Sequence, residues 1–123
     1  MAVGATIENY LEHIHMLSME KDKVRQRDVC ASMGYSRPTV SVTLRSMRDE
    51  GYLDIGEDSS ITLTKKGKKI AESTYERHCV ISAMLISLGV DEETADEDAC
   101  RIEHDMSQKS FDAVKAHYEK WKK

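Results

Sequence analysis

The sequence predicts a mainly α-helical protein, in which a winged helix-turn-helix is followed by a helical region. Three observations predict this fold class. Apolar residues recur at helical spacing through most of the chain. Two short helical segments are joined by a glycine-containing turn, and two alternating segments that follow are typical of a β-hairpin. We expect the boundary between the two regions near residue 65, giving residues 1–65 and 66–123.

The first element is an amphipathic helix expected over residues 6–20, because its apolar residues recur every three or four positions. Thr6 is predicted to cap it. A short helix over residues 24–31 comes next, and Gly34 is placed to adopt the positive φ that commonly ends a helix. These two helices supply the first half of a helix-turn-helix.

A new helix is predicted to begin at Ser36 and to end at Gly51, with serine as its cap and Pro38 in its first turn. Its apolar stripe would face the core, and its other face is basic and hydroxylated. Arginine and hydroxyl side chains can bind base edges and phosphates in the major groove. The candidate DNA-binding residues are Ser36, Arg37, Pro38, Thr39, Ser41, Thr43, Arg45 and Arg48.

The predicted hairpin consists of strands over residues 52–55 and 60–63, joined by a polar turn. This hairpin is the wing of the winged helix. Its tip carries Glu57 and Asp58, which phosphates would repel, so we do not expect the tip to grip the DNA backbone.

Three further helices are predicted beyond the wing. Thr64 would cap a long helix over residues 66–88, which Gly89 ends. A helix over residues 91–106 follows, and Ser107 or Ser110 begins the last one, to about residue 121.

Composition and charge exclude several protein classes. The formal net charge is −4, yet residues 21–48 hold seven Lys/Arg against two Asp, and residues 91–105 hold eight Asp/Glu against one Arg. The basic region suits phosphates and the acidic region suits cations, although both also fit ordinary solvated surfaces. No segment resembles a signal peptide or a membrane span, and three cysteines do not make a disulfide framework. We expect a cytoplasmic protein.

A candidate metal site lies in the last part of the chain. Cys100, Glu103 and His104 occupy positions i, i+3 and i+4, which share one face of a helix. Thiolate, carboxylate and imidazole together are typical ligands of a transition metal. His78 and the pair Asn9 and Glu12 are further candidates. Each of these residues also has a purely structural interpretation, and the sequence alone does not bring the segments together.

The chain resembles the DtxR/MntR family of metal-activated transcriptional repressors from about residue 7 to residue 118. The resemblance is carried by ENYLE at 8–12, SRPTVS at 36–41, LTKKG at 63–67, Arg77 with His78, and above all DACRIEHDMS at 98–107. It implies homodimers that bind a palindromic DNA operator when loaded with iron or manganese, and that repress metal-uptake genes. It also implies that residues 66–123 form the metal-binding and dimerisation region, in a short form without the family's C-terminal barrel-like domain.

The resemblance places the family's metal ligands on Asn9, Glu12, His78, Cys100, Glu103 and His104. Manganese-type members have a carboxylate at position 100 and Asp at position 9. Iron-type members share the cysteine, but have Met at position 9 and no carboxylate at position 12. A second site of the iron type would need ligands near His78, Ser82 and Asp96, and serine is a poor ligand.

The ligand chemistry favours a soft or borderline metal ion. A thiolate prefers ions such as Fe(II) to Mn(II), while the carboxylates keep Mn(II) possible. We therefore expect Fe(II) first and Mn(II) second. The main alternative is a winged-helix regulator that needs no metal. An enzyme is disfavoured, because the sequence has no HExxH motif, nucleophile elbow or phosphate-binding glycine loop.

Overall fold

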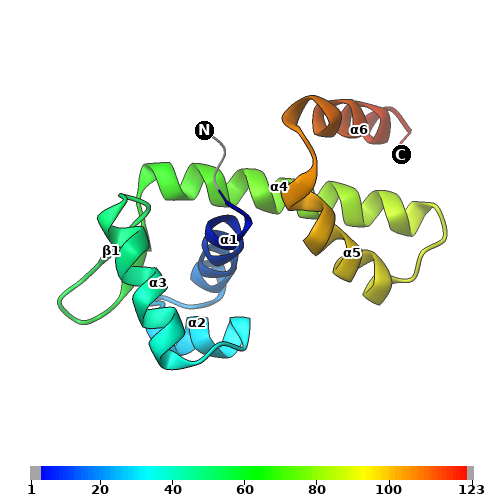
Figure 1. The fold of residues 1–123 in the computed structure, drawn as a ribbon. Coiled ribbons are helices and arrows are strands. Elements are labelled where there is room, and N and C mark those ends of the chain that lie inside the picture. The colour runs from blue at the N-terminus through cyan, green and yellow to red at the C-terminus, as the bar shows by residue number, and fades with distance from the viewer. Residues whose placement is uncertain (1–3, 122–123) are drawn as a thin grey trace. The chain divides into compact units, whose positions relative to one another are not determined.

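The computed structural model describes residues 4–121, which form six helices and one two-stranded sheet (Figure 1). The chain divides into two compact units, and the boundary between them lies between Glu72 and Ser73, within the fourth helix. Among the described residues, no helix is long and apolar enough to cross a membrane. The elements are α1 (Ala5–Glu20), α2 (Gln26–Met33), α3 (Arg37–Asp49), β1 (Leu53–Ile55), β2 (Ile61–Leu63), α4 (Lys65–Ser87), α5 (Glu92–Asp105) and α6 (Gln108–Trp121).

The first unit is the predicted winged helix-turn-helix, and its apolar core joins α1, α2, α3 and the hairpin. Gly34 ends α2 with a φ of 73°, as predicted. One prediction is wrong: Thr6 does not cap α1, because the N-cap position is Gly4 and Thr6 lies inside the helix. The core contains Tyr10, Leu11, Ile14, Val24, Val29, Val40, Leu44, Met47, Leu53, Ile61 and Ala71.

The second helix begins two residues later than predicted because Val24 is extended rather than helical. It forms an antiparallel bridge with Ile61, whose N–H donates to the Val24 carbonyl at 2.7 Å. Helical periodicity did not separate this buried valine from the helix that follows it. The bridge fastens the wing to the segment between α1 and α2.

Helix α3 begins as the sequence predicts. The Ser36 hydroxyl accepts a hydrogen bond from the backbone N–H of Thr39 at 3.4 Å, and Pro38 lies in the first turn. Val40, Leu44 and Met47 are all buried, so the opposite side of α3 is left exposed. The hairpin pairs Leu53 with Leu63 and Ile55 with Ile61, which confirms the predicted wing.

The start of α4 packs so closely on the wing that only glycine fits at position 67. A Cβ atom there would lie 2.0 Å from the Tyr52 carbonyl oxygen. Thr64 fixes the same turn, because its hydroxyl donates to the Gly51 carbonyl at 2.7 Å and accepts from the Gly67 N–H at 3.2 Å. The predicted Thr64 cap is therefore confirmed.

The second unit contains the rest of α4 with α5 and α6. Asp91 caps α5, and the hydrogen bond from the Thr94 N–H, 3.0 Å long, holds the pKa of that carboxyl below its usual range. Ser107, rather than Ser110, begins α6, since its hydroxyl accepts from the Ser110 N–H at 3.1 Å. An ion pair of 2.7 Å between Lys115 and Glu76 links α6 to α4 and raises the pKa of Lys115.

Candidate metal centre and DNA-reading face

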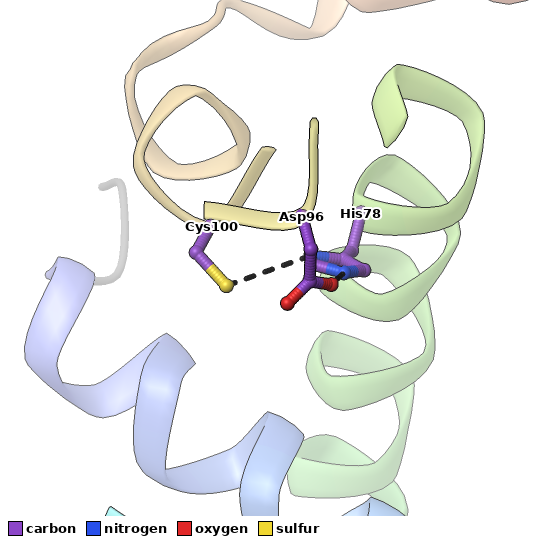
Figure 2. A group of neighbouring side chains, drawn as sticks. All are labelled: His78, Asp96 and Cys100. Atoms are coloured by element: carbon purple, nitrogen blue, oxygen red, sulfur yellow. Dashed lines mark hydrogen bonds and ion pairs between the residues drawn. The ribbon is translucent and has the colours of Figure 1, made fainter. Parts of the chain in front are cut away.

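Five potential metal ligands gather in the second unit, on two helices. His78 lies on α4, and Figure 2 shows it facing Asp96 and Cys100 of α5. Asp96 and Cys100 are four residues apart and share one helical face. Glu103 and His104 extend that face by one turn toward the end of α5. The structure thus brings together the four predicted ligands that lie on α4 and α5.

The His78 imidazole lies between two carboxylates. Its Nε2 is 2.7 Å from Asp96 Oδ1, and its Nδ1 is 2.8 Å from Glu103 Oε1. The Cys100 thiol approaches the same Nδ1, at 3.8 Å (Figure 2). The ligand atoms of His78, Asp96 and Cys100 all lie within 4.8 Å of one another, close enough for one ion to reach them.

Glu103 supplies the test of whether a cation fits here. Glu103 is 1% exposed, and within residues 4–121 its Oε2 atom accepts no hydrogen bond. The His104 Nε2 lies 3.6 Å from that oxygen, beyond ordinary hydrogen-bond length. Burying an unsatisfied carboxylate oxygen is costly, and a divalent ion would satisfy it. The residues present therefore fit a metal ion.

The remaining predicted ligands, Asn9 and Glu12, lie on α1 in the first unit, three residues apart. Asp96 lies outside the six expected ligands and was named only for the doubtful second site of the iron type. Its i, i+4 spacing to Cys100 was the available signal, since it places both side chains on the face that carries the site.

The donor set in the second unit suits a transition metal. It combines a thiolate, two imidazoles and two carboxylates, a mixture that borderline ions such as Fe(II), Co(II) and Zn(II) prefer. Cys100 and Asp96 are exposed, whereas Glu103 is buried. An ion entering from solvent would therefore meet the thiol and the Asp96 carboxylate first.

The second candidate site is the exposed face of α3, in the first unit. Arg37, Thr39, Arg45 and Arg48 are exposed there, and Ser41 and Thr43 are half-buried. Among the described residues, the contacts of two guanidiniums are local and weak: Arg45 Nε reaches the Ser41 carbonyl at 3.4 Å, and Arg48 reaches Asp49 at 3.4 Å. Such contacts are easily exchanged for phosphate or base contacts.

Two predicted DNA-binding hydroxyls are already engaged within the protein. Ser36 caps α3 and donates to the Thr39 hydroxyl at 2.9 Å, and Thr43 donates to the Thr39 carbonyl at 3.1 Å. Val42 was not predicted, yet it is 61% exposed on α3. An exposed apolar side chain on a helix of this kind can contact a thymine methyl group.

The acidic wing tip is neutralised by the protein's own cations. The Asp58 carboxylate lies 2.5 Å from Lys23 Nζ and 3.9 Å from Arg25 Nη2. The hydrogen bond from Lys23, followed by those from the Ser60 hydroxyl and N–H, holds the pKa of Asp58 far below its usual range. At neutral pH the tip thus carries an ion cluster in place of an isolated negative charge.

Replacing Asp58 with asparagine is expected to tighten binding to any DNA duplex several-fold at low salt. The change removes a charge that repels phosphate and releases Lys23 and Arg25 for phosphate contacts. Fluorescence anisotropy over a salt series would measure it, and a steeper salt dependence is expected. Asp54→Asn on β1 is the matched control, which removes an equal charge without releasing a cation. Equal effects of the two variants would contradict the prediction.

Both units match families of known proteins. Residues 2–61 match the family model described as the iron dependent repressor N-terminal DNA binding domain. Residues 64–123 match the iron dependent repressor metal binding and dimerisation domain. Together the two models account for almost the whole chain.

Individual relatives are transcriptional regulators. The chain is 36% identical over 110 residues to the transcriptional regulator MntR of Salmonella typhimurium, covering 89% of this chain and 70% of that protein. It is 30% identical over 122 residues to an HTH-type transcriptional regulator of Methanocaldococcus jannaschii, covering 98% of each. Among solved structures, the manganese regulator SloR matches with a TM-score of 0.81 and 26% identity, over 97% of this chain and 55% of SloR. The chain thus spans about half the length of the solved structure.

Proposed function

Since the chain belongs to the iron-dependent repressor (DtxR/MntR) family of transcriptional regulators, we propose that it is a metal-activated repressor of iron or manganese homeostasis genes. The observation that carries the proposal is the cluster of His78, Asp96 and Cys100, to which Glu103 is joined through His78, with the buried Glu103 oxygen that accepts no hydrogen bond from the described residues. This cluster lies in the same chain as a helix-turn-helix with an exposed basic face.

The proposed metal ligands are the six that the family resemblance names: Asn9, Glu12, His78, Cys100, Glu103 and His104. The thiolate favours Fe(II), and Mn(II) is the second candidate because most of the other donors are oxygens. When bound, the ion supplies positive charge that offsets the carboxylates and the thiolate. A cation that also recruited Asn9 and Glu12 would couple metal binding to the DNA-binding unit.

Asp96 has a different proposed role, that of orienting His78. A metal-binding histidine usually gives its second ring nitrogen to a carboxylate, which fixes the tautomer and the ring. With Nε2 donating to Asp96, Nδ1 would be left free of its proton and directed toward Cys100 and Glu103. This arrangement supports a site on the Nδ1 side of the ring.

The proposed partners are double-stranded DNA with a palindromic operator and a second copy of this chain. The proposed location is the cytoplasm. A symmetric dimer presents two reading helices, and a two-fold DNA sequence matches them. The candidate reading residues are those on the exposed face of α3, from Ser36 to Arg48.

DNA binding as a function of metal tests the proposal. The probe is a duplex selected from a random-sequence library by the protein in the presence of Mn(II), or of Fe(II) without oxygen. We expect metal to tighten binding at least tenfold and a chelator to reverse the effect. Equal affinity with metal and with chelator would instead indicate a metal-independent regulator.

The matched variant is Arg45→Ala. Its side chain is exposed on α3, outside the unit that holds the metal cluster. Loss of one arginine contact to a base costs about 1–3 kcal/mol, so DNA binding should weaken by roughly ten- to a hundredfold. Metal titration of this variant should match that of the wild type. An Arg45→Ala protein that binds the duplex normally would contradict the assignment of α3.

A further inference from the structure

Arg77 joins three helices around the end of α5. Its Nη1 donates to the carbonyl oxygens of Glu103, at 3.0 Å, and of Met106. Its Nη2 donates to Gln108 Oε1 at 3.0 Å, on α6. The guanidinium Cζ also lies 5.3 Å from the centre of the Phe111 ring, which is 2% exposed.

These contacts satisfy groups that a helix leaves open. The last four carbonyls of an α-helix have no partner within the helix, and α5 ends at Asp105. A guanidinium is suited to this position, because its donors form a rigid fork and its charge opposes the negative end of the helix dipole. A lysine has no such fork, so it cannot hold the two carbonyls and Gln108 in the same fixed geometry.

Consecutive residues of α4 thereby hold Glu103 at both ends. His78 contacts its carboxylate at 2.8 Å, and Arg77 contacts its backbone carbonyl at 3.0 Å. His104 follows directly in the chain. The backbone that carries two proposed ligands is thus fixed relative to the third.

We propose that Arg77 is a positioning residue of the metal centre, which keeps Glu103 and His104 in register with His78. This inference rests on the proposed function, since it concerns the same metal site. It assigns Arg77 no direct contact with the ion. Its effect passes through the end of α5, and residues that orient ligands typically contribute ten- to a hundredfold to metal affinity.

The sign of the effect separates positioning from electrostatics. Arg77 is a cation near a proposed cation site, so removing its charge alone should tighten metal binding. Loss of positioning should weaken it. Arg77→Met, which keeps the length of the side chain but not its charge, therefore gives opposite results under the two explanations.

The experiment is a Co(II) titration of the full chain, followed by calorimetry and by the cobalt absorption spectrum. For Arg77→Met we expect binding ten- to a hundredfold weaker, with ligand-field bands altered because the coordination geometry changes. Arg77→Lys, which keeps the charge, should lie between this variant and the wild type. If circular dichroism shows that Arg77→Met does not fold, Arg77→Lys serves as the test variant in its place.

The matched control is Arg101→Met, on the same helix as Glu103. The Arg101 side chain is 69% exposed and pairs only with Asp98 among the described contacts, so its loss removes a nearby charge without releasing the end of α5. We expect Co(II) to bind this variant at least as tightly as the wild type. Wild-type affinity and spectrum in both Arg77 variants would overturn the inference, whereas a wild-type protein that binds no Co(II) would overturn the proposed function itself.

Discussion

Glu103→Gln is expected to weaken binding of Co(II) or Mn(II) by more than about 100-fold, beyond the range typical of residues that only orient a ligand. Glutamine preserves the size and shape of the side chain but removes the negative charge. The buried Oε2 of Glu103 accepts no hydrogen bond from the described residues, and the other oxygen already contacts His78. A neutral amide is a much poorer ligand for a divalent ion, particularly in a buried position.

Isothermal titration calorimetry measures this effect directly. Glu97→Gln is the matched control, since Glu97 is an exposed carboxylate on the same helix and outside the cluster. Its affinity should stay within about twofold of the wild type, as expected for the loss of one solvent-screened charge. If the two variants titrate alike, Glu103 is not a ligand and the buried oxygen needs another explanation.

Gly67→Ala is expected to lower the free energy of unfolding by about 3 kcal/mol. In an ordinary helix this change is stabilising by up to about 1 kcal/mol, because alanine has the higher helix propensity. Here the new Cβ would lie 2.0 Å from the Tyr52 carbonyl oxygen, so α4 has to move away from the wing. The Thr64 hydroxyl contacts in the same turn are then strained as well.

Urea unfolding followed by circular dichroism measures the change in stability. Ser73→Ala, an exposed position on the same helix, serves as the control and should be neutral or slightly stabilising. The sign is decisive: a Gly67→Ala protein more stable than the wild type would mean that α4 and the wing do not pack this closely.

Most of the winged helix could be predicted because its determinants are local. The Ser36 cap, the glycine turn at Gly34 and the alternation in the hairpin each depend on neighbouring residues. Val24 shows where such reasoning ends, since its place in a bridge to Ile61 depends on a partner 37 positions away. The Thr6 cap was wrong because the preceding glycine can occupy the N-cap position equally well.

The metal centre was predictable in part for the same reason. Spacing along one helix places Cys100, Glu103 and His104 on one face, but it does not identify what faces them. The structure places the predicted candidate His78 of α4 against this face, with Asp96 at the far side of the imidazole ring. Arg77 could not be found from spacing at all, because it acts on backbone carbonyls, which every residue possesses.

The most direct test of the central claim is a crystal structure of the protein soaked with Mn(II), with anomalous data collected to locate the ion. We expect an anomalous peak within about 2.0–2.5 Å of donor atoms from both α4 and α5, Glu103 Oε2 among them, in line with ordinary bond lengths to metal ions. An ion bound elsewhere, with His78 still held between Asp96 and Glu103, would contradict it.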